Sequence, residues 1–299
     1  PVEQYERCRE GPEGPSRHAW LYRVLVMAGK TDSPIGVFDS GVGGLTVLDE
    51  LLARLPSEDF IYFGDTDWFP YGDKSAEDLR ARADAIAAWL LAQDVKMIVV
   101  ACNTATAAAL AHLQTHLAVP VIGVMTAESH AAVQSSRTRR IGLLATEATV
   151  ASGSYQRMIA AHDAGAEVTA VACPRLAPAI QSGDPFDQSV VDMVREYTQP
   201  LRDADVDTVI LGCTHYPMVA KLIRRQVPDA TLISSGEEIA REIADTLGRQ
   251  GMLGDGGREG HYAFACSGDP DVFGTLGARF MQMPFGDVQR IDPGVGPAT

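Results

Sequence analysis

Short apolar runs alternate with longer segments of helical periodicity along most of the chain. Runs rich in β-branched residues predict strands, whereas apolar residues that recur every three or four positions predict helices. Regular alternation of the two is typical of βαβ units, in which the strands are parallel and helices cover the sheet. We expect strands at residues 34–39, 60–64, 96–101, 120–124, 139–145, 167–172, 207–212 and 230–234. The predicted fold class is therefore α/β, with doubly wound and mainly parallel sheets.

The strand ends of the two halves of the chain follow each other at similar offsets. The run from Ile35 to Phe38 resembles the run from Ile141 to Leu144, and Cys102 is matched by Cys213. We interpret this spacing as two pseudo-symmetric halves that arose by duplication of one unit. The alternative is that α/β chains share such strand spacing by default. Two facing halves would put one thiol on each side of a cleft, because ligands bind beyond the carboxyl ends of parallel strands.

Composition and charge narrow the class of protein. The chain has 299 residues, of which 46% are hydrophobic, so one large or two modest soluble domains are expected. Lys and Arg total 25 against 39 for Asp and Glu, which gives a net charge of −14. Such a balance repels phosphate backbones and anionic lipid surfaces, and we expect neither direct nucleic-acid binding nor membrane binding.

The cysteines and the N-terminal residues indicate a cytoplasmic location. There is no C-x-x-C spacing among Cys8, Cys102, Cys173, Cys213 and Cys266, which favours neither a disulfide framework nor a zinc site. No apolar run is long enough to span a bilayer, and residues 19–28 lack the features of a secretory signal. Residues 1–33 show no sustained period and are interpreted as a flexible N-terminal extension.

Two cysteines are the candidate catalytic groups. Cys102 and Cys213 each follow an apolar run and precede hydroxyl and amide donors, Asn103-Thr104 and Thr214-His215. A thiol at a helix N-terminus has its thiolate stabilised by free backbone N–H groups, which would make it a base. Taken singly, each is better explained as a buried structural thiol, but the matched surroundings favour function. His215 would tune the second thiol or act as an auxiliary acid or base.

The first strand is followed by a glycine-rich loop, residues 39–44. We expect its backbone N–H groups to hold a carboxylate or phosphate, and Asp39 either to polarise a neighbouring group or to cap the next helix. A dinucleotide site is the competing interpretation, with Asp65 at the end of the next strand, although Thr46 replaces the last glycine of that motif. Tyr71-Gly72 would clamp a small ligand, and Thr146 and Thr149 are the second half's candidate hydroxyls.

The residues that carry these features resemble the glutamate racemase family. The matching segments run from about Pro34 to near Val288 and include IGVFDSGVGGLTVL, FPYGDKS, VVACNTATAAAL, PVIGV, GLLATEATVASGSYQ and LGCTHYP. The resemblance implies a cofactor-independent isomerase that interconverts L- and D-glutamate. Such an enzyme supplies D-glutamate for peptidoglycan synthesis, and so serves cell wall biogenesis and cell shape.

The resemblance also implies residue roles. Cys102 and Cys213 would exchange the α-proton on opposite faces of the substrate, assisted by Asp39 and His215. The implied substrate contacts are Asp39, Ser40, Tyr71, Gly72, Asn103, Thr104, Thr149, Thr214 and His215. No metal and no organic cofactor is implied. Many members carry a glutamate at the position of Gln181, so an auxiliary carboxylate is in doubt here.

The family's architecture implies two domains with the active site in the cleft between them. Domain 1 would comprise residues 34–125 and 234–299, and domain 2 residues 126–233. The expected assembly is a homodimer or a monomer. The Phe-Pro-Tyr-Gly sequence and the N-terminal extension resemble the branch of the family that a muramyl-peptide precursor activates.

Other functions stay open from the sequence alone. An aspartate racemase, or a related amino-acid racemase, would share both thiols, whereas a decarboxylase of the same superfamily needs only one. A non-catalytic protein that binds an amino acid or contacts DNA gyrase is a further alternative from a different class.

Overall fold

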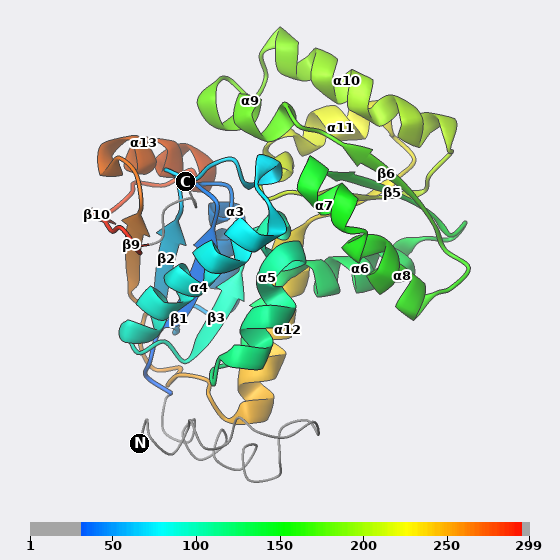
Figure 1. Ribbon diagram of the computed structural model, residues 1–299. Coiled ribbons are helices and arrows are strands. Elements are labelled where there is room, and N and C mark those ends of the chain that lie inside the picture. Colours follow the sequence, from blue (N-terminus) through cyan, green and yellow to red (C-terminus); the bar gives the residue numbers. More distant parts are fainter. Residues whose placement is uncertain (1–30, 295–299) are drawn as a thin grey trace.

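Two parallel sheets form the framework of the computed structural model, which describes residues 31–294. The expected extension at residues 1–33 lies almost entirely outside the described residues, as does Cys8. The two sheets and their covering helices form two lobes, joined by α6 and α12 (Figure 1). The α/β class predicted from periodicity is confirmed.

The first sheet has six strands in the order β10-β9-β2-β1-β3-β4. Its inner strand β1 pairs in parallel with β2 and β3, so that Val37 lies between Tyr62 and Val99. These strands are buried on both faces, which explains why they read as continuous apolar runs. The strand bounds are β1 Ile35–Asp39, β2 Phe60–Gly64, β3 Met97–Val100, β4 Val121–Gly123, β9 Tyr262–Cys266 and β10 Val288–Arg290.

The second sheet repeats the strand order of the first. Its order is β6-β5-β7-β8, which corresponds strand for strand to β2-β1-β3-β4. Every pair is parallel in both sheets. The shared topology favours the predicted duplication over coincidental spacing. The bounds are β5 Arg140–Ala145, β6 Glu167–Ala172, β7 Thr208–Gly212 and β8 Thr231–Ile233.

Helices cover both faces of each sheet (Figure 1). In the first half α4 packs against α5, while α12 packs against both α3 and α6. A typical covering helix is α4, which buries Leu79, Ala83, Ile86 and Leu90 at helical spacing and is capped by the Ser75 side chain. The bounds are α3 Leu45–Arg54, α4 Ala76–Ala92, α5 Asn103–His116, α6 Val124–Ser135, α7 Glu147–Ser152, α8 Ser154–His162, α9 Leu176–Ser182, α10 Gln188–Asp203, α11 Ala220–Gln226, α12 Ser235–Gln250 and α13 Pro270–Met281, with short 3₁₀ helices η1 Tyr71–Asp73 and η2 Tyr216–Val219.

The chain passes between the two sheets twice. It leaves the first sheet after β4 through α6, and it returns after β8 through α12. The last strands, β9 and β10, then extend the first sheet beyond β2. The eight strands expected from periodicity are all present, and β9 and β10 are two further strands that were not expected. In β10 two of three residues are exposed, and in β9 the first two of five residues are exposed.

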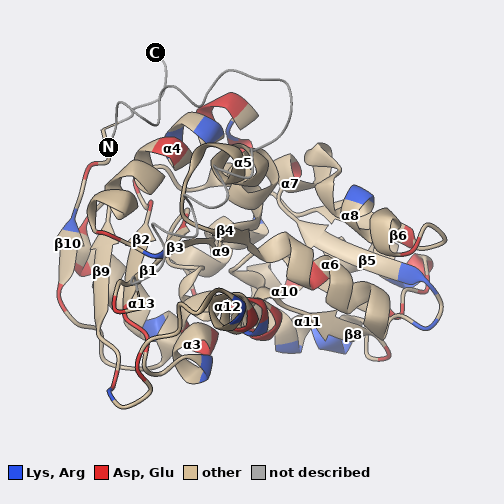
Figure 2. Ribbon diagram, turned by 90° about the horizontal axis from the view of Figure 1, so that it is seen from below, with Lys and Arg blue, Asp and Glu red and all other residues tan. Residues whose placement is uncertain are grey.

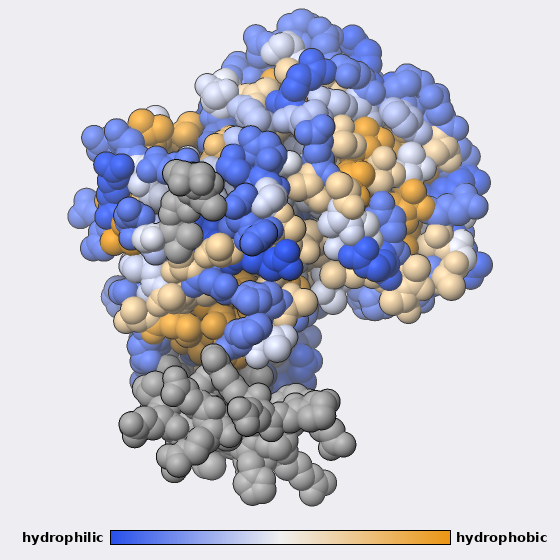
Figure 3. Space-filling model, in the orientation of Figure 1, coloured by the Kyte–Doolittle hydropathy of each residue, from blue (hydrophilic) through white to orange (hydrophobic). Residues whose placement is uncertain are grey.

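Charged and apolar residues are distributed over the whole surface. Lys and Arg segments are interspersed with Asp and Glu segments around the described chain (Figure 2). One face of the molecule is largely hydrophilic, with hydrophobic residues in separate groups over both lobes (Figure 3). Within residues 31–294, no helix has the length and apolar character that a membrane span requires.

Candidate active site

The predicted site residues come together where strand ends of the two sheets meet. Asp39 ends β1, Cys102 follows β3 as the N-cap of α5, and Cys213 follows β7. All three are buried, with exposed fractions of 0%, 5% and 8%. Each half therefore contributes one buried thiol at the end of a strand, and Asp39 of the first half contacts Thr214 beside Cys213.

Cys102 is held by the glycine-rich loop and by the start of α5. The pKa of its thiol is raised to about 12, mainly by burial and in addition by the negative charge of Asp39, while hydrogen bonds from Ala105 and Ser40 act in the opposite direction. The helix N-terminus acts in the predicted direction, but burial outweighs it. Burial therefore favours the protonated thiol, contrary to the expectation of a thiolate at the helix N-terminus.

The pKa of the Cys213 thiol is also raised, mainly by burial. Burial raises the pKa of its thiol well above the usual value, while a hydrogen bond from the His215 backbone lowers it. The charges of Cys102 and Asp39 raise it further, so the two thiols lie within electrostatic range of each other. The Cys213 Sγ atom is 3.8 Å from Nδ1 of His215.

The glycine-rich loop touches the second half directly. Asp39 accepts hydrogen bonds from the Gly41 N–H at 3.0 Å and from the Thr214 hydroxyl at 3.2 Å. Burial raises the pKa of Asp39, although these hydrogen bonds oppose the rise. A Cβ atom at Gly43 would lie 2.4 Å from the His215 ring and 2.5 Å from the Thr214 hydroxyl, so only glycine fits there.

His215 is buried among groups from both halves. Burial lowers the pKa of its imidazole to about 3, and the charge of Arg279 adds to this effect, so the ring is neutral at physiological pH. Its Nε2 atom lies 2.9 Å from Oε1 of Gln181. Phe69 and Phe280 pack around the ring at centroid distances of 5.3 and 5.6 Å.

Three threonine hydroxyls form a second polar group between the halves. Thr104 at the start of α5 lies 2.8 Å from Thr146 and 3.1 Å from Thr149, measured between hydroxyl oxygens. Thr146 is the N-cap of α7, which also explains its position. The structure thus brings Thr104, Thr146 and Thr149 together as one cluster of hydroxyl groups from the two halves.

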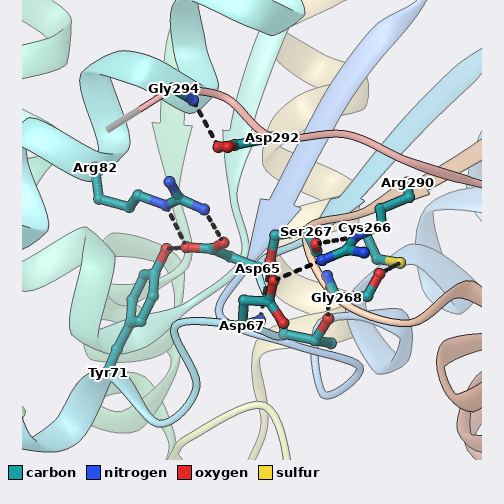
Figure 4. A network of polar contacts seen from close by, with 11 residues as sticks. Asp65, Asp67, Tyr71, Arg82, Cys266, Ser267, Gly268, Arg290, Asp292 and Gly294 are labelled. Carbon is teal, nitrogen blue, oxygen red and sulfur yellow. Dashed lines mark hydrogen bonds and ion pairs between the residues drawn. The ribbon is translucent and has the colours of Figure 1, made fainter. Parts of the chain in front are cut away.

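Tyr71 occupies the expected place but directs its hydroxyl elsewhere. Its O–H donates to Oδ2 of Asp65 at 2.5 Å, and Arg82 binds both oxygens of the same carboxylate at 2.8 and 2.6 Å (Figure 4). Asp65 is therefore neutralised in the core and unsuited to hold a ribose, which disfavours the dinucleotide interpretation. At Gly72 a Cβ atom would lie 2.9 Å from Thr146, so this loop also touches the second half.

The Asn103 side chain contacts two residues, Glu128 and Tyr155, that the sequence did not predict as part of the site. Its Nδ2 atom donates to Glu128 at 2.9 Å and to the Tyr155 hydroxyl at 2.7 Å, while its Oδ1 atom is buried without a partner among the described residues. Glu128 lies inside α6, outside every matched segment, whereas Tyr155 lies in the matched segment GLLATEATVASGSYQ but was given no role. Gln181, in contrast, was already noted from the resemblance to the racemase family.

Two cavities lie outside this contact. One, of about 280 Å³, lies between α5, β4, α6 and α12, with Gln114, Thr126 and Glu242 in its wall. The other, of about 550 Å³, lies beyond β2, β9 and β10, with Trp68, Arg82 and Arg290 in its wall. Within the described part of the chain, no group of three or more His, Cys, Asp or Glu side chains is arranged to hold a metal ion.

Known proteins share both the sequence and the fold. The sequence profile of the Asp/Glu/Hydantoin racemase family matches residues 35–243. A glutamate racemase of Bacillus cereus is 39% identical over 263 residues, which cover 88% of this chain and 98% of that protein. The crystal structure of glutamate racemase from Francisella tularensis in complex with D-glutamate has a TM-score of 0.82 at 32% identity, with 88% of this chain and 99% of that chain covered. The Escherichia coli glutamate racemase, in complex with L-glutamate and the activator UDP-MurNAc-Ala, has a TM-score of 0.71 at 26% identity, with 87% and 98% covered.

The two parallel-sheet halves give the α/β fold of the racemase structures, and the named relatives, which are glutamate racemases, place the chain among the isomerases. The chain belongs to the Asp/Glu/Hydantoin racemase family.

Proposed function

We propose that the protein is a cofactor-independent glutamate racemase that uses Cys102 and Cys213 as its two acid/base groups. The observation that carries this proposal is the burial of both thiols at one contact between matched strand ends. The names of the relatives, and the D-glutamate bound to the Francisella tularensis enzyme, support glutamate as the substrate.

The reaction is a proton exchange at one carbon. A thiolate on one side removes the α-proton, so the C–H bond breaks and an S–H bond forms. The thiol on the other side then donates its proton to the opposite face, and its S–H electron pair stays on sulfur. The product is the mirror-image amino acid, and the two cysteines exchange roles in the reverse direction.

The first thiolate forms only when the substrate is bound. Burial keeps both thiols protonated in the empty site, but the positive α-ammonium group of an amino acid would favour the thiolate. Neutral His215 has its Nδ1 atom 3.8 Å from Cys213 and is placed to take that proton, and Asp39 serves the Cys102 side. Hydrogen-bond donors around the buried site stabilise the developing charge and exclude water.

The substrate contacts proposed on this basis are Ser40, Asn103, Thr104, Thr149 and Thr214, with Asp39 and His215. Tyr71 and Gly72 would contribute through the backbone, because the Tyr71 hydroxyl is bound to Asp65.

A circular dichroism assay with L-glutamate, D-glutamate and L-aspartate, without added cofactor, tests this function. Racemisation of glutamate but not aspartate is expected. Turnover of aspartate alone would instead establish the aspartate racemase alternative, and binding without turnover would favour a non-catalytic protein.

Removal of either thiol tests the mechanism. Cys102→Ser and Cys213→Ser should each lower kcat for glutamate by at least a thousandfold, because a hydroxyl is a far weaker acid and base partner than a thiol. Cys266→Ser is the matched control, since Cys266 is also buried but lies at the end of β9. Full activity in either of the first two variants would refute the two-thiol mechanism.

The wider role follows from the same proposal. We propose a cytoplasmic enzyme that supplies D-glutamate for peptidoglycan. Its domain 1 would comprise residues 34–125 and 234–299, and its domain 2 residues 126–233.

The activator in the Escherichia coli structure supports a muramyl-peptide precursor as an effector of this protein too. An increase in kcat/KM on addition of UDP-MurNAc-L-Ala would support this, and no change would exclude it. Homodimer or monomer, and a contact with DNA gyrase, remain predictions.

A further inference from the structure

Glu128 is a buried carboxylate that the proposed mechanism does not use. It lies on α6 with no exposed surface, and three other helices each direct a donor to it. Asn103 of α5 donates to Oε2 at 2.9 Å, Tyr155 of α8 donates to the same oxygen, and Ser235 of α12 donates to Oε1 at 2.5 Å. The cluster therefore connects Asn103, the residue after Cys102, to α6 and α12, the two helices through which the chain passes between the sheets.

The carboxylate determines which way the Asn103 side chain faces. An ionised carboxylate only accepts hydrogen bonds, so the amide group of Asn103 must present Nδ2 to it and turn Oδ1 away. Oδ1 is then a buried acceptor with no donor among the described residues, which is unfavourable until a ligand supplies one. Glutamate at neutral pH has N–H donors only on its α-ammonium group.

We propose that Glu128 is a positioning residue, which orients Asn103 so that Oδ1 accepts a hydrogen bond from the α-ammonium group of the substrate. The inference rests on the proposed function, because it concerns the same substrate and site. Glu128 itself does not touch the substrate. It acts on Asn103 directly, through one charge-assisted hydrogen bond, and indirectly through Tyr155, whose hydroxyl donates to Glu128 and accepts from Asn103.

The protonation state of Glu128 gives this role a signature. Burial raises the pKa of Glu128 to about 7, and the hydrogen bonds from Ser235, Tyr155 and Asn103 oppose the rise. Of these three partners only Tyr155 titrates, and the charge of Cys213 reaches it. When Glu128 is protonated it becomes a weaker, neutral acceptor, so the orientation of Asn103 is held less firmly below pH 7.

Three variants distinguish an effect on the orientation of Asn103 from a general effect on the stability of the fold. Glu128→Met fills the space without an acceptor and should raise KM for glutamate at least tenfold at pH 8.5. Glu128→Gln keeps a neutral acceptor and should raise KM about threefold at pH 8.5, but should match the wild type at pH 6. Ser235→Ala removes a donor from the same carboxylate without touching Asn103, so it should leave KM within twofold even if Tm falls.

Racemisation followed by circular dichroism, with far-UV spectra and Tm for each variant, distinguishes the outcomes. Unchanged KM in Glu128→Met, or an equal rise in Ser235→Ala, would overturn the positioning role. If Glu128→Met does not fold, the pH profiles decide: a KM profile of Glu128→Gln parallel to that of the wild type would contradict the inference. A wild type that fails to racemise glutamate would overturn the proposed function, whereas a racemising wild type with insensitive variants would overturn only the role of Glu128.

Discussion

Gly43 lies where the two halves approach each other most closely. The overlap that a Cβ atom would make with His215 and Thr214 involves packed side chains with little room to move. We expect Gly43→Ala to lower kcat/KM by about a hundredfold, because a displacement of about 1 Å in a catalytic group has an effect of this size. Steady-state kinetics of glutamate racemisation measure it.

Gly256→Ala is the control for this substitution, since nothing lies within 4 Å of a Cβ atom there. Wild-type kinetics in Gly43→Ala would show that the contact between the loop and His215 is not needed in the productive state.

Gln181 decides the charge next to His215. A carboxylate 2.9 Å from Nε2 would favour the imidazolium form, so Gln181→Glu should raise the pKa of His215 from about 3 by about 1–3 units. An NMR titration of the imidazole nitrogens measures this shift.

Gln181→Met, which removes the acceptor without adding charge, is the control. An unchanged pKa in Gln181→Glu would mean that the new carboxylate turns away from the ring. The result bears on function, because the neutral ring is the state that accepts a proton from Cys213.

At the scale of elements, α13 ties the first sheet to the second half. Arg279 of α13 donates to the carbonyl oxygens of Ile180, Gln181 and Gly183 at 2.7–2.8 Å. These carbonyls end α9 and have no partners within that helix, so the guanidinium satisfies them and complements the helix dipole. The C-terminal segment thus helps to position Gln181 and, through Gln181, the ring of His215.

Arg279→Met should weaken this connection. Hydrogen bonds to a charged group contribute about 2 kcal/mol, and we expect the free energy of unfolding to fall by about that amount, with a rise in KM for glutamate. Chemical denaturation and kinetics test both effects. Arg249→Met, at an exposed position near the end of α12, controls for the loss of one charge. A variant with unchanged stability and KM would exclude the connection.

At the scale of the whole molecule, burial of one carboxylate makes stability depend on pH. The pKa of Glu128 is about 7 when folded against 4.5 for an ordinary glutamate, so the unfolded chain releases its proton first. The contribution of Glu128 is therefore fully present below about pH 4.5 and is lost as pH rises through 7, by up to about 3 kcal/mol.

The glutamine in Glu128→Gln cannot ionise, so this variant should not show the loss of stability as the pH rises. We expect its stability, relative to the wild type, to improve between pH 5 and pH 8 in urea denaturation. Glu259→Gln, which removes an exposed carboxylate, controls for the change in net charge. A stability difference between Glu128→Gln and the wild type that is independent of pH would mean that Glu128 does not titrate in this range.

Local sequence was sufficient for much of the fold and for the residues at strand ends. Strands β1 to β8 and the positions of Asp39, Cys102 and Cys213 follow from apolar runs and the residues that end them, since a parallel strand always presents its carboxyl end to the same edge. The strand β10 was missed because it has only three residues, two of them exposed, at the sheet edge, whereas β9 is an inner strand of five apolar residues that the sequence prediction omitted.

What the sequence by itself determined is the α/β class, the repeat of one strand order and the two thiols with their adjacent donors. Only the tertiary structure decided the environment of those groups: that burial keeps the thiols protonated, that the Tyr71 hydroxyl binds Asp65, and that Glu128, Tyr155 and Ser235 gather behind Asn103. The physical reason is that periodicity is set by neighbours along the chain, whereas desolvation and hydrogen bonding depend on side chains that only folding brings together.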